Sequence, residues 1–204
     1  MKPPVVILAA GASERLGSCK ALVDLHGQSP LERLIRQASL ANAEEIAVVA
    51  GAHQREIGAA LERIDPSRRV RLLFNPSWSL GRTGSAGVAA ASFPGRALMI
   101  APVDVPLVQS ETFRRLFEAW EAQGEPPRGW LAPCLARPAR YGHPLILGRE
   151  LSRLLPELDP SLPLSGLRAQ AQPLWAVPVT DLSILDDLDT PEDLERLRAR
   201  LAAH

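Results

Sequence analysis

The stretch VVILAAGASERLGSCK, residues 5–20, decides how the rest of this chain is expected to fold. It begins with a continuous run of β-branched and aliphatic residues, which is typical of a strand buried on both faces of a parallel sheet. The run breaks into a loop of alanine, glycine and serine, whose backbone N–H groups can come close to a bulky anion. We expect Arg15 and Lys20, which follow, to turn toward phosphate oxygens. The stretch therefore predicts a strand that ends in a loop for a nucleoside triphosphate.

The spacing in this loop excludes two familiar phosphate-binding motifs. A Walker A loop ends in Gly-Lys-Ser/Thr, whereas Gly17 is followed by Ser-Cys-Lys and Lys20 by Ala21. The loop also lacks the G-x-G-x-x-G set of dinucleotide-binding proteins. An ordinary strand-to-helix connection with two surface cations is the structural alternative.

Composition limits the partners and the location that we expect. The 23 basic and 23 acidic residues give a formal net charge of zero at pH 7, so we expect no nucleic-acid or membrane partner. Cys19 and Cys134 have neither a C-x-x-C nor a zinc spacing, which indicates reduced thiols in a cytoplasmic protein. No signal-peptide core or membrane-length apolar run occurs. The 204 residues are expected to form a single domain, 1–204, and a monomer and a homo-oligomer both stay open.

Strand and helix patterns alternate through the first half of the chain. Strands are expected at 5–8, 45–50, 70–74 and 97–101, and apolar residues at helical spacing mark helices near 30–38, 57–64, 85–92 and 110–120. After residue 123 the alternation weakens, with strands at 130–134, 145–147 and 174–179 and a last helix around 191–201. This order predicts an α/β fold, a three-layer α/β/α sandwich around a Rossmann-like, mainly parallel sheet.

Asp104 is the strongest candidate for a metal ligand. In such sheets ligands bind at the carboxyl ends of the strands, and Asp104, in APVDVP, follows the strand at 97–101. A carboxylate that faces a triphosphate loop supplies the hard oxygen that Mg²⁺ prefers. The alternative is an acidic turn residue that bonds nearby backbone N–H groups.

Two further acidic residues precede the last helix. Thr190 is expected to cap that helix, which explains the acidic residues after it but not Asp187 and Asp189 before it. Alternate residues of an extended segment point to the same side, so both could address one cation. Asp187 is our first choice for the second Mg²⁺ ligand, and Asp189 is the alternative.

Three polar residues are candidates for substrate contacts. His143 has an ordinary pKa near neutrality, but a phosphate acceptor is already ionised and needs no base, so we expect substrate positioning or a structural role. Ser85 is expected to contact the nucleotide base or ribose. Asn75 is expected at the nucleotide as well, with a turn start at Asn-Pro as its structural alternative.

The complete string LAAG-x-S-x-R-L-G-x-x-K resembles the signature of the MobA-like nucleotidyltransferases. N-P-x-W-x-x-G followed by Ser85, then D-V-P at 104–106, G-H-P at 142–144 and D-L-D-T-P-E-D-L at 187–194, occur in the order of that family. Ala10 and the acidic pair before the last helix are most similar to the molybdenum-cofactor cytidylyltransferases. The resemblance implies a fold of the nucleotide-diphospho-sugar transferase type and Mg²⁺ on Asp104. It also implies nucleotide contacts at Gly11, Ser13, Arg15 and Lys20. We expect Leu8, Ala9 and Ala10, which lead into the loop, to contact the nucleotide as well.

Two segments depart from that family pattern. The segment at 164–168 keeps Gly166 and Arg168 of a G-D-x-G-A-R motif but lacks its acid. The residues after Gly81 are not the usual Ser-Ser-Leu. Both departures lie where an acceptor or nucleotide would sit, so the acceptor is left open.

The function expected from the sequence is nucleotidyl transfer. An acceptor phosphate attacks the α-phosphorus of an NTP, in the first place CTP, and pyrophosphate leaves, with Arg15, Lys20, Asp104 and Mg²⁺ stabilising the charge. The expected partners are the NTP and a small phosphorylated acceptor, which could be the molybdenum cofactor. Transfer to a phosphosugar or to phosphocholine is the alternative enzyme, and a non-catalytic nucleotide-binding domain is the alternative outside catalysis.

Overall fold

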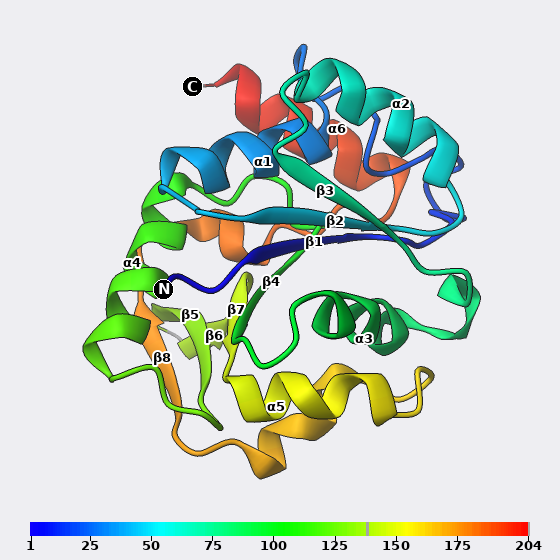
Figure 1. The fold of residues 1–204 in the computed structure, drawn as a ribbon. Coiled ribbons are helices and arrows are strands. Elements are labelled where there is room, and N and C mark those ends of the chain that lie inside the picture. Colours follow the sequence, from blue (N-terminus) through cyan, green and yellow to red (C-terminus); the bar gives the residue numbers. More distant parts are fainter. Residues whose placement is uncertain (138, 204) are drawn as a thin grey trace.

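The computed structural model describes residues 1–137 and 139–203, which are built around an eight-stranded sheet (Figure 1). The strands follow the order β3-β2-β1-β4-β7-β5-β6, and β8 pairs with β5 outside this path. Their bounds are β1 Val5–Ala9, β2 Ile46–Ala50, β3 Val70–Phe74, β4 Leu98–Pro102, β5 Trp130–Ala136, β6 Ala139–Tyr141, β7 Leu145–Leu147 and β8 Leu174–Pro178.

Strand β1 lies inside the parallel part of the sheet. It pairs in parallel with β2 on one side and with β4 on the other, and β3 continues in parallel beyond β2. Every residue of β1, β2 and β4 is buried, as expected for aliphatic strands with helices on both faces. Strand β7 runs antiparallel to β4 and to β5, so the sheet is mixed at this end. The predicted α/β sandwich with a mainly parallel sheet is confirmed.

Helices cover both faces of the sheet because side chains alternate along each strand. Val5 and Ile7 belong to one apolar cluster with residues of α1 Pro30–Leu40, α2 Gln54–Ile64 and α4 Ser110–Ala122. Val6 and Leu8 belong to a second cluster with residues of α3 Arg82–Ser92 and α5 Arg149–Leu154. Figure 1 shows α1 and α2 on one side of the sheet and α3 and α5 on the other.

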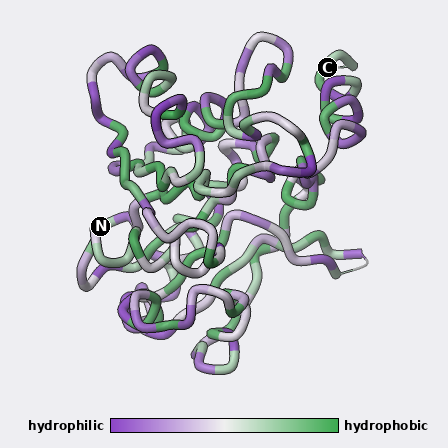
Figure 2. The backbone as a smooth tube through the Cα atoms, turned by 90° about the vertical axis from the view of Figure 1, so that its right-hand side faces the viewer, coloured by the Kyte–Doolittle hydropathy of each residue, from purple (hydrophilic) through white to green (hydrophobic). Residues whose placement is uncertain are grey.

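The last helix, α6 Pro191–Ala202, brings the end of the described chain back to the first loop. Its Leu197 is fully buried in a small cluster with Leu16, Leu25 and Leu188. Hydrophilic and hydrophobic residues alternate along α6 (Figure 2), as an amphipathic surface helix requires. Thr190 caps the helix in a capping box with Asp193, so the predicted cap is confirmed.

One strand of the sheet is interrupted where the sequence predicted only a short apolar run. β6 and β7 both pair antiparallel with β5, and the register shifts by two residues between them. Residues 142–144, Gly-His-Pro, fill this interruption. Gly142 has no room for a side chain, since a Cβ there would lie 2.3 Å from the Ile184 carbonyl oxygen. The chain is therefore held tightly against the segment that leads to α6.

Several elements differ from those predicted, most of them by one to three residues at an end. Helix α3 begins at Arg82 rather than at 85, because Gly81 adopts a φ of 142° and lets the helix start directly after it. Strand β6 was not predicted, because its residues carry no alternating pattern. Short 3₁₀ turns fill several connections, at Trp78–Leu80, Leu155–Glu157, Leu164–Gln170 and Leu182–Leu185.

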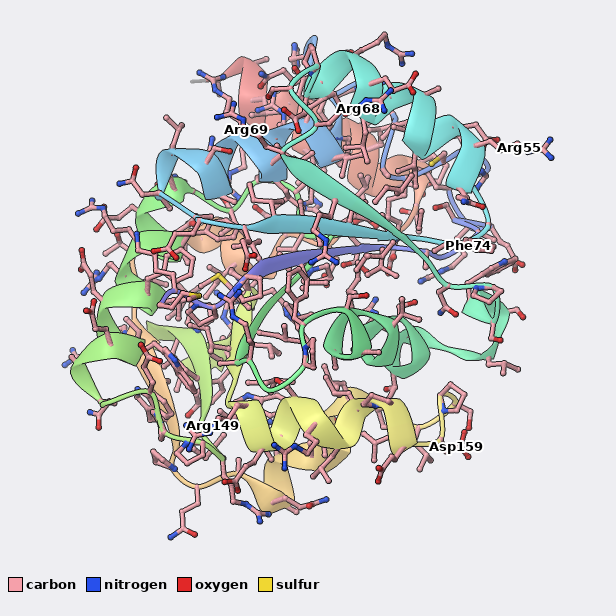
Figure 3. The ribbon with its side chains drawn as sticks, in the orientation of Figure 1. Arg55, Arg68, Arg69, Phe74, Arg149 and Asp159 are labelled. Atoms are coloured by element: carbon pink, nitrogen blue, oxygen red, sulfur yellow. The ribbon has the colours of Figure 1, made fainter. Side chains whose placement is uncertain are left out.

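The outer surface carries many arginines, and Figure 3 shows Arg55, Arg68, Arg69 and Arg149 with exposed side chains. Within the described residues, no helix has both the length and the apolar character needed to cross a membrane.

Candidate functional site

The loop after β1 folds into a compact turn around Ser13. The Ser13 carbonyl oxygen accepts from the N–H groups of Leu16 and Gly17, each at 3.1 Å, and its Oγ accepts from the Lys20 N–H at 3.1 Å. Ser13 itself has a φ of 58°, in the left-handed region that is uncommon for residues with a side chain. A Cβ on Gly11 would meet no atom within 4 Å, so the space in front of the loop is open. The loop can therefore receive a ligand against its backbone.

Arg15 and Lys20 converge on one carboxylate from the other end of the chain. Arg15 Nη2 donates to Asp189 Oδ2 at 2.9 Å, and Lys20 Nζ donates to Asp189 Oδ1. The Lys20 hydrogen bond, helped by the charge of Arg15, lowers the pKa of the Asp189 carboxyl. The two cations that the sequence assigned to phosphates are thus side by side.

Asp104 joins the same group through the backbone as well as the side chain. Its carbonyl oxygen accepts from the Leu188 N–H at 2.7 Å, which fixes the segment before α6 to the end of β4. Its carboxylate Oδ2 accepts from Arg82 Nη2 at 2.7 Å. The other oxygen, Oδ1, is buried and has no hydrogen-bond partner among the described residues. A buried carboxylate oxygen of this kind costs free energy unless a ligand satisfies it.

Asp187, in the tail segment, is near enough to Asp104 for the charges of the two carboxylates to interact. Burial raises the pKa of the Asp187 carboxyl, and the negative charges of Asp104 and Asp189 raise it further. Among the described residues no cation lies within ion-pair distance of the Asp187 carboxylate, whereas Asp189 is engaged by two. No group of three or more His, Cys, Asp or Glu side chains suited to a metal occurs in the described part of the chain. The two candidate ligands for a divalent cation here are Asp104, with its unsatisfied oxygen, and Asp187.

Replacing Asp187 with asparagine is expected to stabilise the fold at neutral pH. The raised pKa means that the folded protein disfavours the ionised carboxylate, which lowers the free energy of unfolding. This loss of stability is complete above the pKa of the folded state and disappears below the pKa of the unfolded state. Because the carboxylate is partly exposed, we expect a penalty below about 1 kcal/mol and a rise in Tm of up to about 3 °C.

Scanning calorimetry at about pH 7.5 and at about pH 3 measures this effect, and the gap in Tm between variant and wild type should close in acid. A variant that melts below the wild type at neutral pH would contradict the placement of Asp187 among like charges.

The open space in front of the loop is a cleft of about 390 Å³. Most of the predicted site residues line it, namely Leu8, Ala10, Gly11, Ser13, Arg15, Lys20, Ser85 and Asp104, together with Asp189. Ala9 lines a smaller adjoining pocket with Lys20 and Asp104. Asn75 is buried behind the cleft, where its Nδ2 donates to Ser85 Oγ at 3.0 Å. This hydrogen bond holds Ser85 in place, so Asn75 supports the cleft wall from behind.

Arg82 is a site residue that the sequence analysis missed. It is the first residue of α3, and Gly81 before it approaches another segment so closely that a Cβ would lie 2.1 Å from the Pro160 carbonyl oxygen. This contact directs the start of α3 toward Asp104. The signal in the sequence was a basic residue directly after N-P-x-W-x-x-G and shortly before Ser85.

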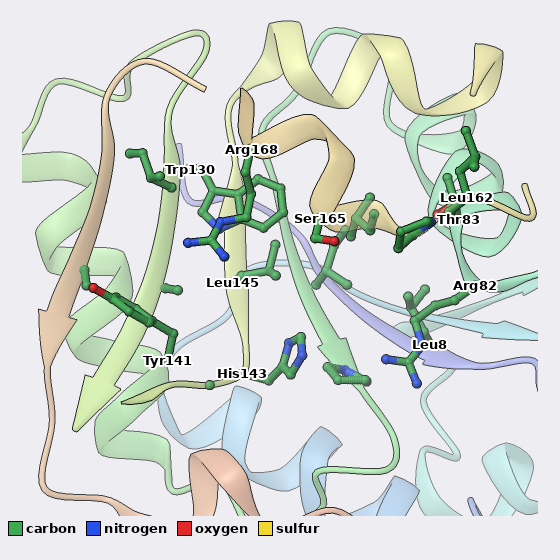
Figure 4. Close-up of a pocket in the computed structure, with 18 of the residues that line it drawn as sticks. Leu8, Arg82, Thr83, Trp130, Tyr141, His143, Leu145, Leu162, Ser165 and Arg168 are labelled. Atoms are coloured by element: carbon green, nitrogen blue, oxygen red, sulfur yellow. Dashed lines mark hydrogen bonds between the residues drawn. The ribbon is translucent and has the colours of Figure 1, made fainter. Parts of the chain in front are cut away.

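A second, larger cavity of about 600 Å³ adjoins the cleft and shares Leu8 and Arg82 with it (Figure 4). His143 lines this cavity, at the interruption between β6 and β7. Burial lowers the pKa of His143, with the nearby Arg82 charge acting in the same direction and the Asp104 charge against it. The ring is therefore neutral at pH 7, and its Nδ1 is buried without a partner among the described residues.

The far side of the cavity was not predicted from the sequence. Figure 4 shows Tyr141, Trp130 and Arg168 away from Arg82, with His143 between the two sides. The Arg168 guanidinium lies 6.0 Å from the centre of the Tyr141 ring. Among the described residues that line the cavity, two are arginines and none is acidic.

Comparison with known proteins gives a consistent family. Residues 5–175 match the family model described as "MobA-like NTP transferase domain". A probable molybdenum cofactor guanylyltransferase of Natronomonas pharaonis is 30% identical over 205 residues, which cover 97% of this chain and 97% of that protein. The "Bifunctional protein GlmU" of Sorangium cellulosum is 28% identical over 146 residues, or 67% of this chain. The aligned part spans only 30% of that relative's length.

A solved structure shares the fold at low sequence identity. Rv0371C of Mycobacterium tuberculosis, in complex with manganese, superposes with a TM-score of 0.76 at 20% identity, covering 98% of this chain and 99% of that one.

Proposed function

Because the chain belongs to the MobA-like NTP transferase family, we propose that it transfers a nucleoside monophosphate from an NTP to a phosphorylated acceptor and releases pyrophosphate. One observation carries this proposal. The loop after β1, the end of β4 and the segment before α6 meet at one cleft, through the pairing of Arg15 and Lys20 with Asp189 and the hydrogen bond from Leu188 to Asp104.

The cleft supplies the contacts that a triphosphate needs. The exposed backbone of Gly11 and its neighbours can donate N–H groups to phosphate oxygens, and Lys20 and Arg15 add positive charge. In this structure Asp189 pairs with both cations, one on each carboxylate oxygen. We propose that the triphosphate takes over these cations from Asp189 when it binds.

Asp104 and Asp187 would hold a divalent cation, for which we propose Mg²⁺. When bound, this ion supplies charge neutralisation at the phosphates. The unsatisfied Oδ1 of Asp104 and the like-charge strain on Asp187 support this assignment, as does the manganese bound by the structural relative Rv0371C.

The chain's own residues would bind and orient the two reactants. An oxygen of the acceptor phosphate forms the new bond to the α-phosphorus, while the bond from that phosphorus to the bridging oxygen breaks and the electron pair leaves with pyrophosphate. The acceptor phosphate is ionised at pH 7, so no residue has to remove a proton. His143, whose neutral ring is half-buried and near enough to Asp104 to be affected by its charge, would act as a hydrogen-bonding group that positions the acceptor.

Two parts of the proposal concern the identities of the nucleotide base and of the acceptor. Ala10 and the acidic pair before α6 favour CTP, whereas the names of curated relatives such as the Natronomonas protein favour GTP. Those names also support the molybdenum cofactor as the acceptor. A phosphosugar or phosphocholine acceptor is the second candidate, because the larger cavity has a lining without acidic residues among the described ones, which suits any phosphorylated compound.

A pyrophosphate-release assay tests the function. Each of the four NTPs is incubated with a panel of phosphorylated acceptors, with Mg²⁺, with Mn²⁺ and with chelator. We expect release that requires both an acceptor and a divalent ion and that is fastest with CTP or GTP. NTP binding without acceptor-dependent release in any combination would identify a nucleotide-binding domain instead.

A further inference from the structure

Arg82 stands at the junction of the cleft and the larger cavity. It lines both, and Figure 4 shows it at the edge of the larger cavity. Its guanidinium donates to the carboxylate of Asp104 at 2.7 Å. The motifs in the sequence gave this residue no role. Arg82 therefore lies between the sites expected for the nucleotide and for the acceptor, and its guanidinium is placed to bind a phosphate of either one.

The ion pair with Asp104 contributes too little to the stability of the fold to explain why an arginine occupies position 82. The Arg82 side chain is 57% exposed, and a pair with so exposed a member contributes little to stability. Arg82 is also the first residue of an 11-residue helix, where the helix dipole disfavours a cation. The guanidinium has five N–H donors. Among the described residues it donates through one nitrogen, Nη2, to Asp104.

The surroundings favour an anionic ligand on the side away from Asp104. The N-terminus of α3 and the Arg82 guanidinium together present positive charge to the mouth of the larger cavity. That cavity has Arg168 on its far side and no acidic residue among its described lining. A phosphate that enters from this cavity would meet Arg82 before it reached the cleft.

We propose that Arg82 binds the phosphate of the acceptor and that Asp104 only holds this arginine until a divalent cation takes the carboxylate. The inference rests on the proposed function for the identity of its ligand. It also makes a statement about metal binding that needs no turnover, because Arg82 and the cation compete for the same carboxylate.

Two variants test this role. In Arg82→Gln, we expect the KM for the acceptor to rise about 10- to 100-fold, as for the loss of a charge-assisted phosphate contact, with little change in the KM for the NTP. Arg82→Lys should recover part of this loss, because it keeps the charge but not the fork. Arg149→Gln is the matched control, since Arg149 is the exposed first residue of α5 and lines neither cavity.

Two binding measurements do not depend on catalysis. By electron paramagnetic resonance, Arg82→Gln should bind Mn²⁺ several-fold more tightly than wild type in the absence of nucleotide, since the competing cation is gone. In protein loaded with Mn²⁺ and an α,β-methylene NTP, calorimetric titration with inorganic phosphate should show weaker binding to Arg82→Gln and unchanged binding to Arg149→Gln.

The failure of this inference can be told from the failure of the proposed function. A wild-type protein that transfers nucleotide to no acceptor overturns the function, and the Mn²⁺ and phosphate titrations still decide the role of Arg82. An Arg82→Gln variant with wild-type affinity for either Mn²⁺ or phosphate overturns the inference, whatever the activity.

Discussion

Replacing Asp104 with asparagine is expected to lower kcat by about three orders of magnitude. A carboxylate that binds a cation at the reacting phosphates accounts for several kcal/mol of charge stabilisation in the transition state, and about 1.4 kcal/mol corresponds to a tenfold change in rate. Asparagine keeps the size of the side chain but loses its negative charge. Steady-state pyrophosphate release with saturating NTP and Mg²⁺ measures the effect.

The fold should survive this change, because the Asp104 carbonyl oxygen still accepts from Leu188. Thermal unfolding checks this point, and the exposed Asp24→Asn serves as a matched control away from the cleft. A folded Asp104→Asn protein that turns over at the wild-type rate would remove Asp104 from the reaction.

Replacing Lys20 with methionine is expected to lower kcat/KM by about 10²- to 10³-fold, as for other charge-stabilising donors at a reacting centre. The Lys20 side chain is only 13% exposed, and its Nζ pairs with Asp189 inside the cleft. Little water can reach this position to compensate for the lost positive charge. Methionine preserves the length and apolar stem of the side chain. The loss should appear in kcat at saturating NTP, because Lys20 is proposed to stabilise the negative charge of the reacting phosphates.

Lys2→Met provides the control, because Lys2 is the only other lysine of the sequence and bonds to the carbonyl oxygens of Ala41 and Asn42, outside the cleft. Equal rates for Lys20→Met and Lys2→Met would show that the positive charge of Lys20 plays no part in the chemistry.

The parts of the site that follow a strand directly could be predicted from the sequence. The loop after β1 and Asp104 after β4 lie where parallel strands end, and the rule for such sheets brings them together. The pair Asp187 and Asp189 was found because a helix cap explains the residues after it and not those before it. Each of these signals lies within a short stretch of sequence and can therefore be recognised without the structure.

The missed parts depend on contacts between distant segments. Arg82 faces Asp104 because Gly81 packs against Pro160, and no local pattern encodes that approach. Asn75 was predicted at the nucleotide, but whether its amide faced the cleft or Ser85 depended on how α3 packs behind β3. The division between Asp187 and Asp189 likewise required the position of Lys20.

The second half of the chain was the least predictable. The larger cavity combines residues of β5, the interruption at His143 and the turn Leu164–Gln170, which are far apart in sequence and share no periodic pattern. The interruption itself comes from a register shift against β5, which apolar spacing cannot specify.

The central claim is that three chain segments surround one metal-bound triphosphate. A crystal structure of the protein with Mn²⁺ and the α,β-methylene analogue of its best NTP tests it most directly, because anomalous scattering locates the ion independently of the phosphates. The account predicts phosphates against the backbone of residues 11–13 and Mn²⁺ in direct contact with carboxylate oxygens of Asp104 and Asp187. A triphosphate seated elsewhere, or an ion that touches neither carboxylate, would contradict it.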